Sequence, residues 1–131
     1  MVRLASRPER IADPAAALAL FGALAGERVE TAAFAYLDAD RRLIGMRHAR
    51  SCCRDLIDLP VRDVAADALA FDAAALVMAH NHPSGDPTPS VADHDATRLL
   101  LRALDPLGVR LLDHLVLSCG ASASFRDLGL L

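Results

Sequence analysis

Two histidines and one aspartate are spaced so that they can bind a single metal ion. His80 and His82 stand two residues apart at the end of a short apolar run. In extended backbone this spacing turns both rings to one face, with Cα atoms about 6.5–7 Å apart. Asp93 falls in the first turn of the helix expected next. Two imidazoles and one carboxylate leave a fourth tetrahedral position for water, which is typical of a catalytic zinc rather than a structural one.

A hydrolytic zinc site also needs a base and a group that stabilises the developing oxyanion. For these the sequence offers a resemblance. The run HNHPSGDPTPSVAD, from His80 to Asp93, resembles the H-x-H-(seven residues)-S-x-x-D signature of the JAMM (JAB/MPN+) metalloproteases, in the wording typical of the RadC-like JAB branch. The resemblance continues through four later segments, which are Leu107-Gly108-Val109, Leu112-Asp113-His114, Ser124-Phe125 and Gly129.

The resemblance implies a role for each matching residue. His80, His82 and Asp93 would be the zinc ligands, and Ser90 would donate a hydrogen bond to the tetrahedral intermediate. Glu30 stands eight residues before Asp38, the end of the first predicted strand, where the family places a glutamate. It would take a proton from the zinc-bound water. The chain has only three glutamates, so finding one at this position supports the match. One zinc ion per chain is the cofactor implied.

The resemblance also implies a fold. It predicts an α/β domain with three layers, in which helices flank a mixed sheet as in the JAB/MPN and cytidine-deaminase-like folds. We expect a helical lead-in over residues 1–27 and the JAB domain over residues 28–131. Two features depart from the family. The chain has no room for the helix-hairpin-helix region typical of RadC proteins, which weakens a DNA-binding role. Arg50-Ser51-Cys52-Cys53 stands where a Gly-Thr pair is common, which leaves the substrate groove undefined.

Hydrophobic patterning and turn residues predict the elements that must position these residues. The continuously apolar segment Ala73–Ala79 predicts a strand buried on both faces. A loop with three prolines follows it, and Ser90 begins a helix. With a strand over 109–117 this makes a βαβ-like unit, whose loop lies where α/β sheets usually bind ligands. The other predicted elements are helices over 15–24 and 60–69 and strands over 29–38 and 43–46, whereas residues 47–58 give no clear element.

Each candidate also has a purely structural interpretation. Ser90 and Asp93 fit a helix N-cap and its capping-box partner, and both roles are compatible because a hydroxyl can accept one hydrogen bond and donate another. Glu30 can be a solvated charge at a strand end. We expect Asp113 and His114 to support the site or the fold rather than to bind the metal.

The remaining polar candidates are expected outside the site. His48 and His94 are predicted at the surface, and Cys52-Cys53 as small buried hydrophobes rather than a redox pair. Arg98 and Arg102 lie four residues apart on the helix after the metal-binding motif. They form a solvated face, or they hold a carboxylate of a peptide substrate.

Composition excludes several classes of protein. With 53% hydrophobic residues among 131, the chain is not disordered by default, and no apolar run is long enough for a membrane span. The net charge of −3 argues against a broad phosphate-binding surface. All fourteen basic residues are arginine, which excludes lysine chemistry. Three cysteines without a CxxC motif favour a reducing, cytoplasmic compartment over a disulfide framework.

The function expected is a zinc-dependent metallohydrolase of JAMM type that cleaves a peptide or isopeptide bond in a peptide or protein substrate. The alternative is a zinc-containing RadC-type module, associated with DNA repair or protein interaction, that performs no turnover. A zinc deaminase is disfavoured because H-x-E followed by P-C-x-x-C is missing. No membrane partner is expected, nucleic acid is disfavoured by charge, and the oligomeric state stays open.

Overall fold

The computed structural model describes residues 10–50 and 59–131. These residues form one five-stranded mixed sheet with strand order β2-β1-β3-β4-β5 and three α-helices. The strands are β1 (Thr31–Leu37), β2 (Leu43–Arg50), β3 (Ala75–Asn81), β4 (Arg110–Ser118) and β5 (Ala121–Ser124). The helices are α1 (Pro14–Phe21), α2 (Val61–Ala70) and α3 (Val91–Leu104), with short 3-10 helices at Gly22–Gly26 and Asp105–Leu107. No helix in this part of the chain is long and apolar enough to cross a membrane.

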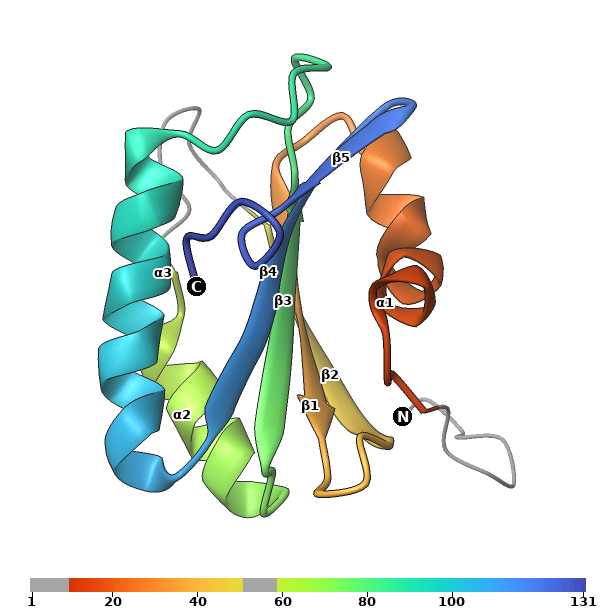
Figure 1. The fold of residues 1–131 in the computed structure, drawn as a ribbon. Coiled ribbons are helices and arrows are strands. Elements are labelled where there is room, and N and C mark those ends of the chain that lie inside the picture. Colours follow the sequence, from red (N-terminus) through yellow and green to blue (C-terminus); the bar gives the residue numbers. More distant parts are fainter. Residues whose placement is uncertain (1–9, 51–58) are drawn as a thin grey trace.

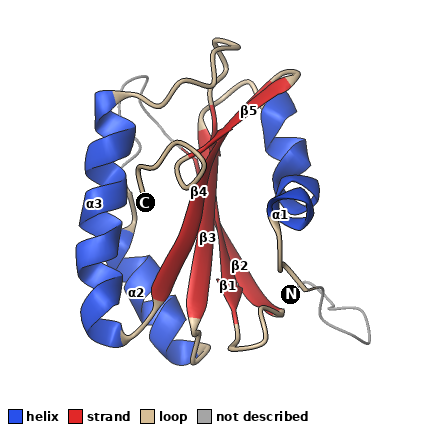
Figure 2. Cartoon of the chain, in the orientation of Figure 1, coloured by secondary structure: helices blue, strands red, loops and turns tan. Residues whose placement is uncertain are grey.

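Helices cover the sheet on both faces, which confirms the three-layer α/β fold (Figure 1). Helix α1 lies against one face, and α2 and α3 lie against the other (Figure 2). Two hydrophobic clusters fill the two spaces between the layers. The first joins Ala17 and Phe21 of α1 to the sheet. The second joins Val64 of α2 and Leu100 of α3 to the opposite sheet face.

Strand alternation decides which polar residues reach which layer. In β3, Ala75, Val77 and Ala79 pack on the α1 side, whereas Leu76 and Met78 pack on the α3 side. Because side chains of a strand alternate between faces, His80 at the end of β3 belongs to the α3 side. The alternation along this apolar segment therefore places the His80 side chain on the sheet face where α3 begins.

Strand β1 brings a distant segment to the same place. It pairs antiparallel with β3, and Ala32 lies opposite His80. Continuing this register by two residues puts Glu30 opposite His82, on the same face as Ala32. Strand β4 pairs with β3 in parallel, so both strands end at this edge of the sheet.

The sheet differs from prediction in several places. Strand β3 covers Ala75–Asn81 rather than 73–79, so His80 and Asn81 belong to the strand and not to the loop after it. Residues 47–50, which gave no element, complete β2, and β5 was not predicted at all. Strand β2 is an edge strand that ends in the polar residues Arg47, His48 and Arg50, and β5 is a four-residue edge strand of alanine and serine. Neither segment has the apolar alternation that signals a strand, because edge strands bury little side-chain surface.

Candidate metal centre

His80 and His82 bring two ring nitrogens together at the carboxyl end of β3. The His80 side chain is fully buried, and that of His82 is 15% exposed. Their Nε2 atoms lie 2.9 Å apart. The backbone N–H of His82 donates to the carbonyl of Leu117, which extends the β3–β4 pairing past the end of β3. The Pro-rich loop that follows bends back, so that the Asp86 carbonyl lies 2.8 Å from His82 Nδ1.

Asp93 supplies the third atom from the first turn of α3. Its Oδ1 lies 3.0 Å from His80 Nε2, and its Oδ2 lies 3.0 Å from His82 Nε2. The capping box predicted from the sequence forms: the Ser90 hydroxyl accepts from the Asp93 N–H, and the Ser90 N–H donates to Asp93 Oδ2. Capping and clustering with the histidines are thus compatible uses of one carboxylate, as its two oxygens allow.

The pKa of Asp93 fits an anionic ligand. Burial alone raises the pKa of this carboxyl, but the hydrogen bond and charge of His80 and the N–H of Ser90 outweigh it. The pKa is therefore held well below its usual range, and the group stays ionised at neutral pH.

The donor set fits a metal ion in both chemistry and spacing. Because a carbonyl oxygen only accepts, His82 Nδ1 carries the hydrogen that bonds to Asp86, and its Nε2 is the nitrogen left to bind a metal ion. Zinc binds such nitrogens and carboxylate oxygens at about 2.0–2.2 Å, so its tetrahedral ligands lie about 3.3 Å apart. The two Nε2 atoms lie 2.9 Å apart, and each lies 3.0 Å from a different oxygen of Asp93. These separations are within a few tenths of an ångström of the spacing that zinc ligands need.

Glu30 completes a cluster of four. One potential ligand atom from each of Glu30, His80, His82 and Asp93 lies within 4.8 Å of the other three. The Glu30 side chain is 25% exposed, and its Oε1 is 4.0 Å from His80 Nε2, a full ångström further than Asp93 Oδ1. Glu30 thus lies beside the three closer atoms and faces solvent.

Asn81, between the two histidines, holds the Glu30 segment in place, a role that the sequence analysis missed. Its side chain is fully buried and faces away from His80. Its Oδ1 accepts from the Thr31 N–H at 2.6 Å, and its Nδ2 donates to the carbonyls of Val29 and Glu27. These bonds fasten the backbone on both sides of Glu30. The position of Asn81 between the two histidines of the motif was the available signal for this role.

Ser90 lies at the rim of the cluster. Its residue is exposed, and its hydroxyl oxygen accepts from the helix N–H of Asp93 at 3.1 Å. Its hydroxyl hydrogen makes no bond to any residue that the structure describes, so it is available to a bound molecule.

Asp113 and His114 lie behind the cluster, outside the set of clustered ligand atoms. His114 is fully buried, and its Nε2 lies 2.6 Å from His80 Nδ1. Burial, and then the charges of His80 and neighbouring histidines, lower the pKa of His114 to about 3, so its ring is neutral. Asp113 accepts from Ser124 and from the N–H of Arg126, which fastens the chain after β5.

One further residue of this network was missed. Thr97 is buried in α3, where its hydroxyl donates to the Asp93 carbonyl and lies 2.6 Å from His114 Nδ1. Its position one turn after Asp93, on the same helix face, was the signal that could have found it.

The other candidates are not among the four clustered residues. His48, Arg98 and Arg102 are exposed, as the surface interpretation predicts. His94 is half-buried, and its ring contacts that of Phe125. Cys52 and Cys53 fall outside the described residues.

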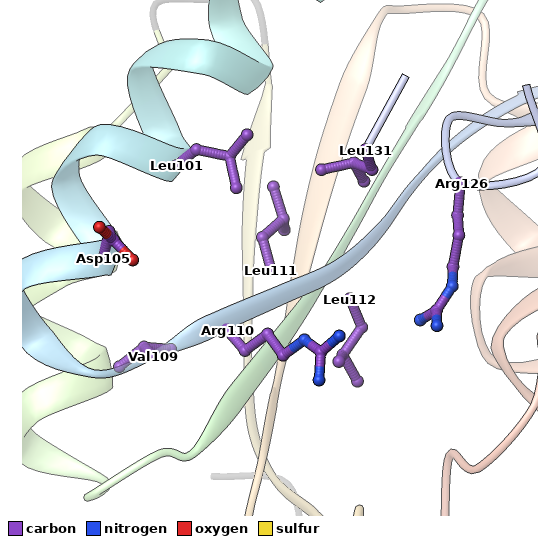
Figure 3. Close-up of a pocket in the computed structure, with 8 residues that line it drawn as sticks. All are labelled: Leu101, Asp105, Val109, Arg110, Leu111, Leu112, Arg126 and Leu131. Carbon is purple, nitrogen blue, oxygen red and sulfur yellow. The ribbon is translucent and has the colours of Figure 1, made fainter. Parts of the chain in front are cut away.

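A separate pocket opens at the other end of α3. It has a volume of about 310 Å³ and lies between the C-terminal half of α3, the start of β4 and the last residue (Figure 3). Leu101, Leu111 and Leu131 supply apolar walls, and Arg110 and Arg126 also line it. None of its residues belongs to the histidine cluster.

Comparison with known proteins identifies relatives over nearly the whole chain. The family model for the RadC-like JAB domain matches residues 11–130. A UPF0758 protein of Xanthomonas campestris pv. campestris (strain 8004) is 37% identical over 124 residues, which cover 94% of this chain and 55% of that protein. A UPF0758 protein of Rhodobacter capsulatus is 44% identical over 96 residues, 73% of this chain and 45% of that protein.

The chain thus spans about half the length of the curated relatives it matches. The names of these relatives state no activity. The family match itself covers almost all of the sequence, including every residue of the cluster. The chain therefore belongs to the RadC-like JAB domain family.

Proposed function

We propose that this protein is a zinc-dependent hydrolase that cleaves an amide bond, either peptide or isopeptide, by attack of a water molecule. One observation carries the proposal: two imidazole nitrogens and a carboxylate lie 2.9–3.0 Å apart, with a second carboxylate beside them. Three close ligands and one neighbouring carboxylate are the composition of a catalytic site rather than of a closed structural site.

His80, His82 and Asp93 would hold the zinc ion. Two nitrogens and one oxygen suit zinc better than they suit magnesium or calcium, which prefer oxygen ligands. A zinc ion bound there lowers the pKa of water toward neutrality and acts as a Lewis acid on a carbonyl oxygen.

Glu30 is suited to move the proton. Its carboxylate is partly exposed and lies near the ligands without joining their closest contacts. In this position it takes a proton from the attacking water and returns it to the leaving amine nitrogen. The bonds from Asn81 to the backbone on either side of Glu30 limit the drift of this carboxylate.

Ser90 is suited to stabilise negative charge on the substrate oxygen. Its hydroxyl oxygen is already engaged as the helix cap, which orients the remaining hydrogen. A donor aimed in advance at a developing oxyanion costs no reorganisation during the reaction.

Access and charge support a peptide or protein as the substrate. Glu30, His82 and Ser90 are all partly or fully exposed, so the cluster is open to a chain passing over the surface. The net charge of −3 gives no general attraction for nucleic acid. A peptide or protein substrate therefore fits this surface better.

The test pairs metal analysis with a cleavage screen. Purified protein is loaded with zinc and offered a peptide library and a set of isopeptide-linked peptides, with Glu30→Gln as the matched variant. We expect one zinc per chain in both proteins, and turnover that is about 10²–10⁴-fold lower in Glu30→Gln. Equal turnover in both proteins contradicts the role of Glu30. Stoichiometric zinc without cleavage of any substrate favours the module without turnover.

A further inference from the structure

A bend in the register of β4 aims His114 at His80. The pairing of β4 with β3 shifts by one residue between Leu111 and Asp113, so that His114 lies opposite Met78. A one-residue shift moves the following side chains to the other face of the sheet. Without it, His114 would face α1; with it, the ring lies on the His80 side and stacks on Phe125, 4.4 Å between centroids.

Thr97 determines which nitrogen of His114 carries the hydrogen. The threonine hydroxyl has a single hydrogen, and it donates that hydrogen to the Asp93 carbonyl at 2.8 Å. The same oxygen lies 2.6 Å from His114 Nδ1 and therefore accepts there. His114 thus carries its hydrogen on Nδ1 and a lone pair on Nε2.

That assignment passes on to His80. His114 Nε2 accepts, so the hydrogen in the 2.6 Å contact belongs to His80 Nδ1. With Nδ1 engaged in this way, His80 Nε2 is the ring nitrogen left to bind a metal ion, and it faces His82 and Asp93. In the opposite arrangement, His114 would carry its hydrogen on Nε2 and donate it to His80 Nδ1. His80 Nε2 would then carry the hydrogen of its own ring and could not bind a metal.

We propose that Thr97 and His114 are positioning residues that hold His80 in the tautomer able to bind metal, an inference that rests on the proposed zinc site. The three side chains form a buried hydrogen-bond chain, with 0–2% exposure at each residue. This series of hydrogen bonds begins at the backbone carbonyl of Asp93, and the carboxylate of the same residue faces His80 directly. One residue of α3 therefore sets both the position of a ligand oxygen and the tautomer of a ligand imidazole.

The first experiment measures zinc affinity by competition with a chelator. Thr97→Val keeps the shape of the side chain but leaves His114 Nδ1 without an acceptor, which favours the opposite tautomer throughout the chain. We expect the zinc dissociation constant to rise by about 10–100-fold, the usual effect of losing such a partner of a ligand histidine. Thr97→Ser restores the hydroxyl and should bind like the parent.

Ser124→Ala is the matched control. It removes another hydroxyl that bonds beside β4, to Asp113, without touching the chain from Asp93 to His80. Its zinc affinity should equal that of the parent. If Thr97→Val binds zinc as tightly as the parent, or no more weakly than Ser124→Ala, the proposal is wrong.

The second experiment reads the tautomers directly and needs neither zinc nor activity. Long-range proton–nitrogen NMR correlations of the imidazoles report which nitrogen carries the hydrogen. In the metal-free parent we expect His114 to carry it on Nδ1, and in Thr97→Val on Nε2. A hydrogen on Nε2 of His114 in the parent overturns the inference. A parent with the expected tautomer that binds no zinc contradicts the proposed function instead.

Discussion

At Ser90, substitution can separate the cap of α3 from the proposed hydrogen bond to the substrate. The Ser90 oxygen caps α3 by accepting from Asp93, and its hydrogen is proposed to meet the substrate. Ser90→Ala should lower the free energy of unfolding by about 1 kcal/mol and Ser90→Gly by only a few tenths, because glycine is a tolerable N-cap. Both should lower turnover by about 10²–10³-fold. Chemical unfolding, zinc content and turnover are compared, and a fully active, zinc-loaded Ser90→Gly would reduce Ser90 to a cap.

Asn81 allows a sharper test of how the Glu30 segment is held. Asn81→Asp keeps the shape but cannot donate to the carbonyls of Glu27 and Val29, so it places a buried carboxylate against two acceptors. Each buried group left unsatisfied costs about 1–3 kcal/mol, so urea unfolding should show a clear loss. We expect kcat to fall more than zinc affinity, since the ligands keep their own contacts. A loss of zinc with unchanged kcat in the loaded fraction would contradict this role.

Among the elements, α2 is joined to strands β1 and β2 through the carboxylate of Asp67. Asp67 of α2 accepts from the Tyr36 hydroxyl at 2.8 Å and from Arg47 of β2, whose Nη2 lies 3.1 Å away. Tyr36 is fully buried, and burial is the first cause that raises the pKa of its hydroxyl. The hydrogen bond from Arg47 is the main cause that lowers the pKa of Asp67.

Asp67→Asn should therefore destabilise the protein in a pH-dependent way. At pH 7 we expect a loss of about 1–3 kcal/mol, the range for hydrogen bonds to a charged group. The pKa of Asp67 is lowered in the folded state, so its contribution is complete above the unfolded pKa of about 3.9 and is lost as pH falls through the folded pKa. Urea unfolding at neutral and acidic pH should show the gap between parent and variant closing below about pH 4. A gap that widens on acidification would contradict the assignment.

Prediction of the elements succeeded where side chains are buried in a regular pattern. The apolar segment of β3 and the capping box of α3 are local signals, and both elements form, although β3 covers Ala75–Asn81 rather than the predicted 73–79. The last four residues of β2 and all of β5 were not predicted. They are strands because their backbone pairs with a neighbour, as Ser118 pairs with Ala121, and not because of their own side chains.

For the whole molecule, the proposed zinc ion should act as a stabiliser. The site joins the end of β3 to the start of α3, so an ion bound there favours the folded state over the unfolded one. At free zinc about 100 times the dissociation constant, the gain in unfolding free energy is about 2.7 kcal/mol. Thermal unfolding with zinc and with chelator should show this shift in the parent and not in His82→Ala.

His48→Ala is the control for that experiment. His48 is an exposed histidine of β2, away from the clustered ligand atoms, so its loss should leave the zinc-dependent shift intact. Full zinc occupancy of His82→Ala by elemental analysis would remove His82 from the ligand set.

The residues of the candidate site divide by how far apart they lie in the sequence. His80, His82, Ser90 and Asp93 fall within fourteen residues, and strand alternation, a Pro-rich loop and a helix cap are enough to predict that they meet. The choice of Glu30 needed a family resemblance, because nothing local ties it to residues fifty positions later. The pairing of Ala32 with His80 brings it there.

The contacts that His114 and Thr97 make behind the proposed ligand His80 come from the tertiary structure. His114 reaches His80 only because the β3–β4 register shifts by one residue, and Thr97 reaches His114 only because α3 packs on that face. Register and packing are set by the burial of both sheet faces at once, a balance of many weak contacts between distant segments. Spacing along the chain is enough to predict which residues are the proposed ligands, whereas the fold decides which buried partner contacts His80.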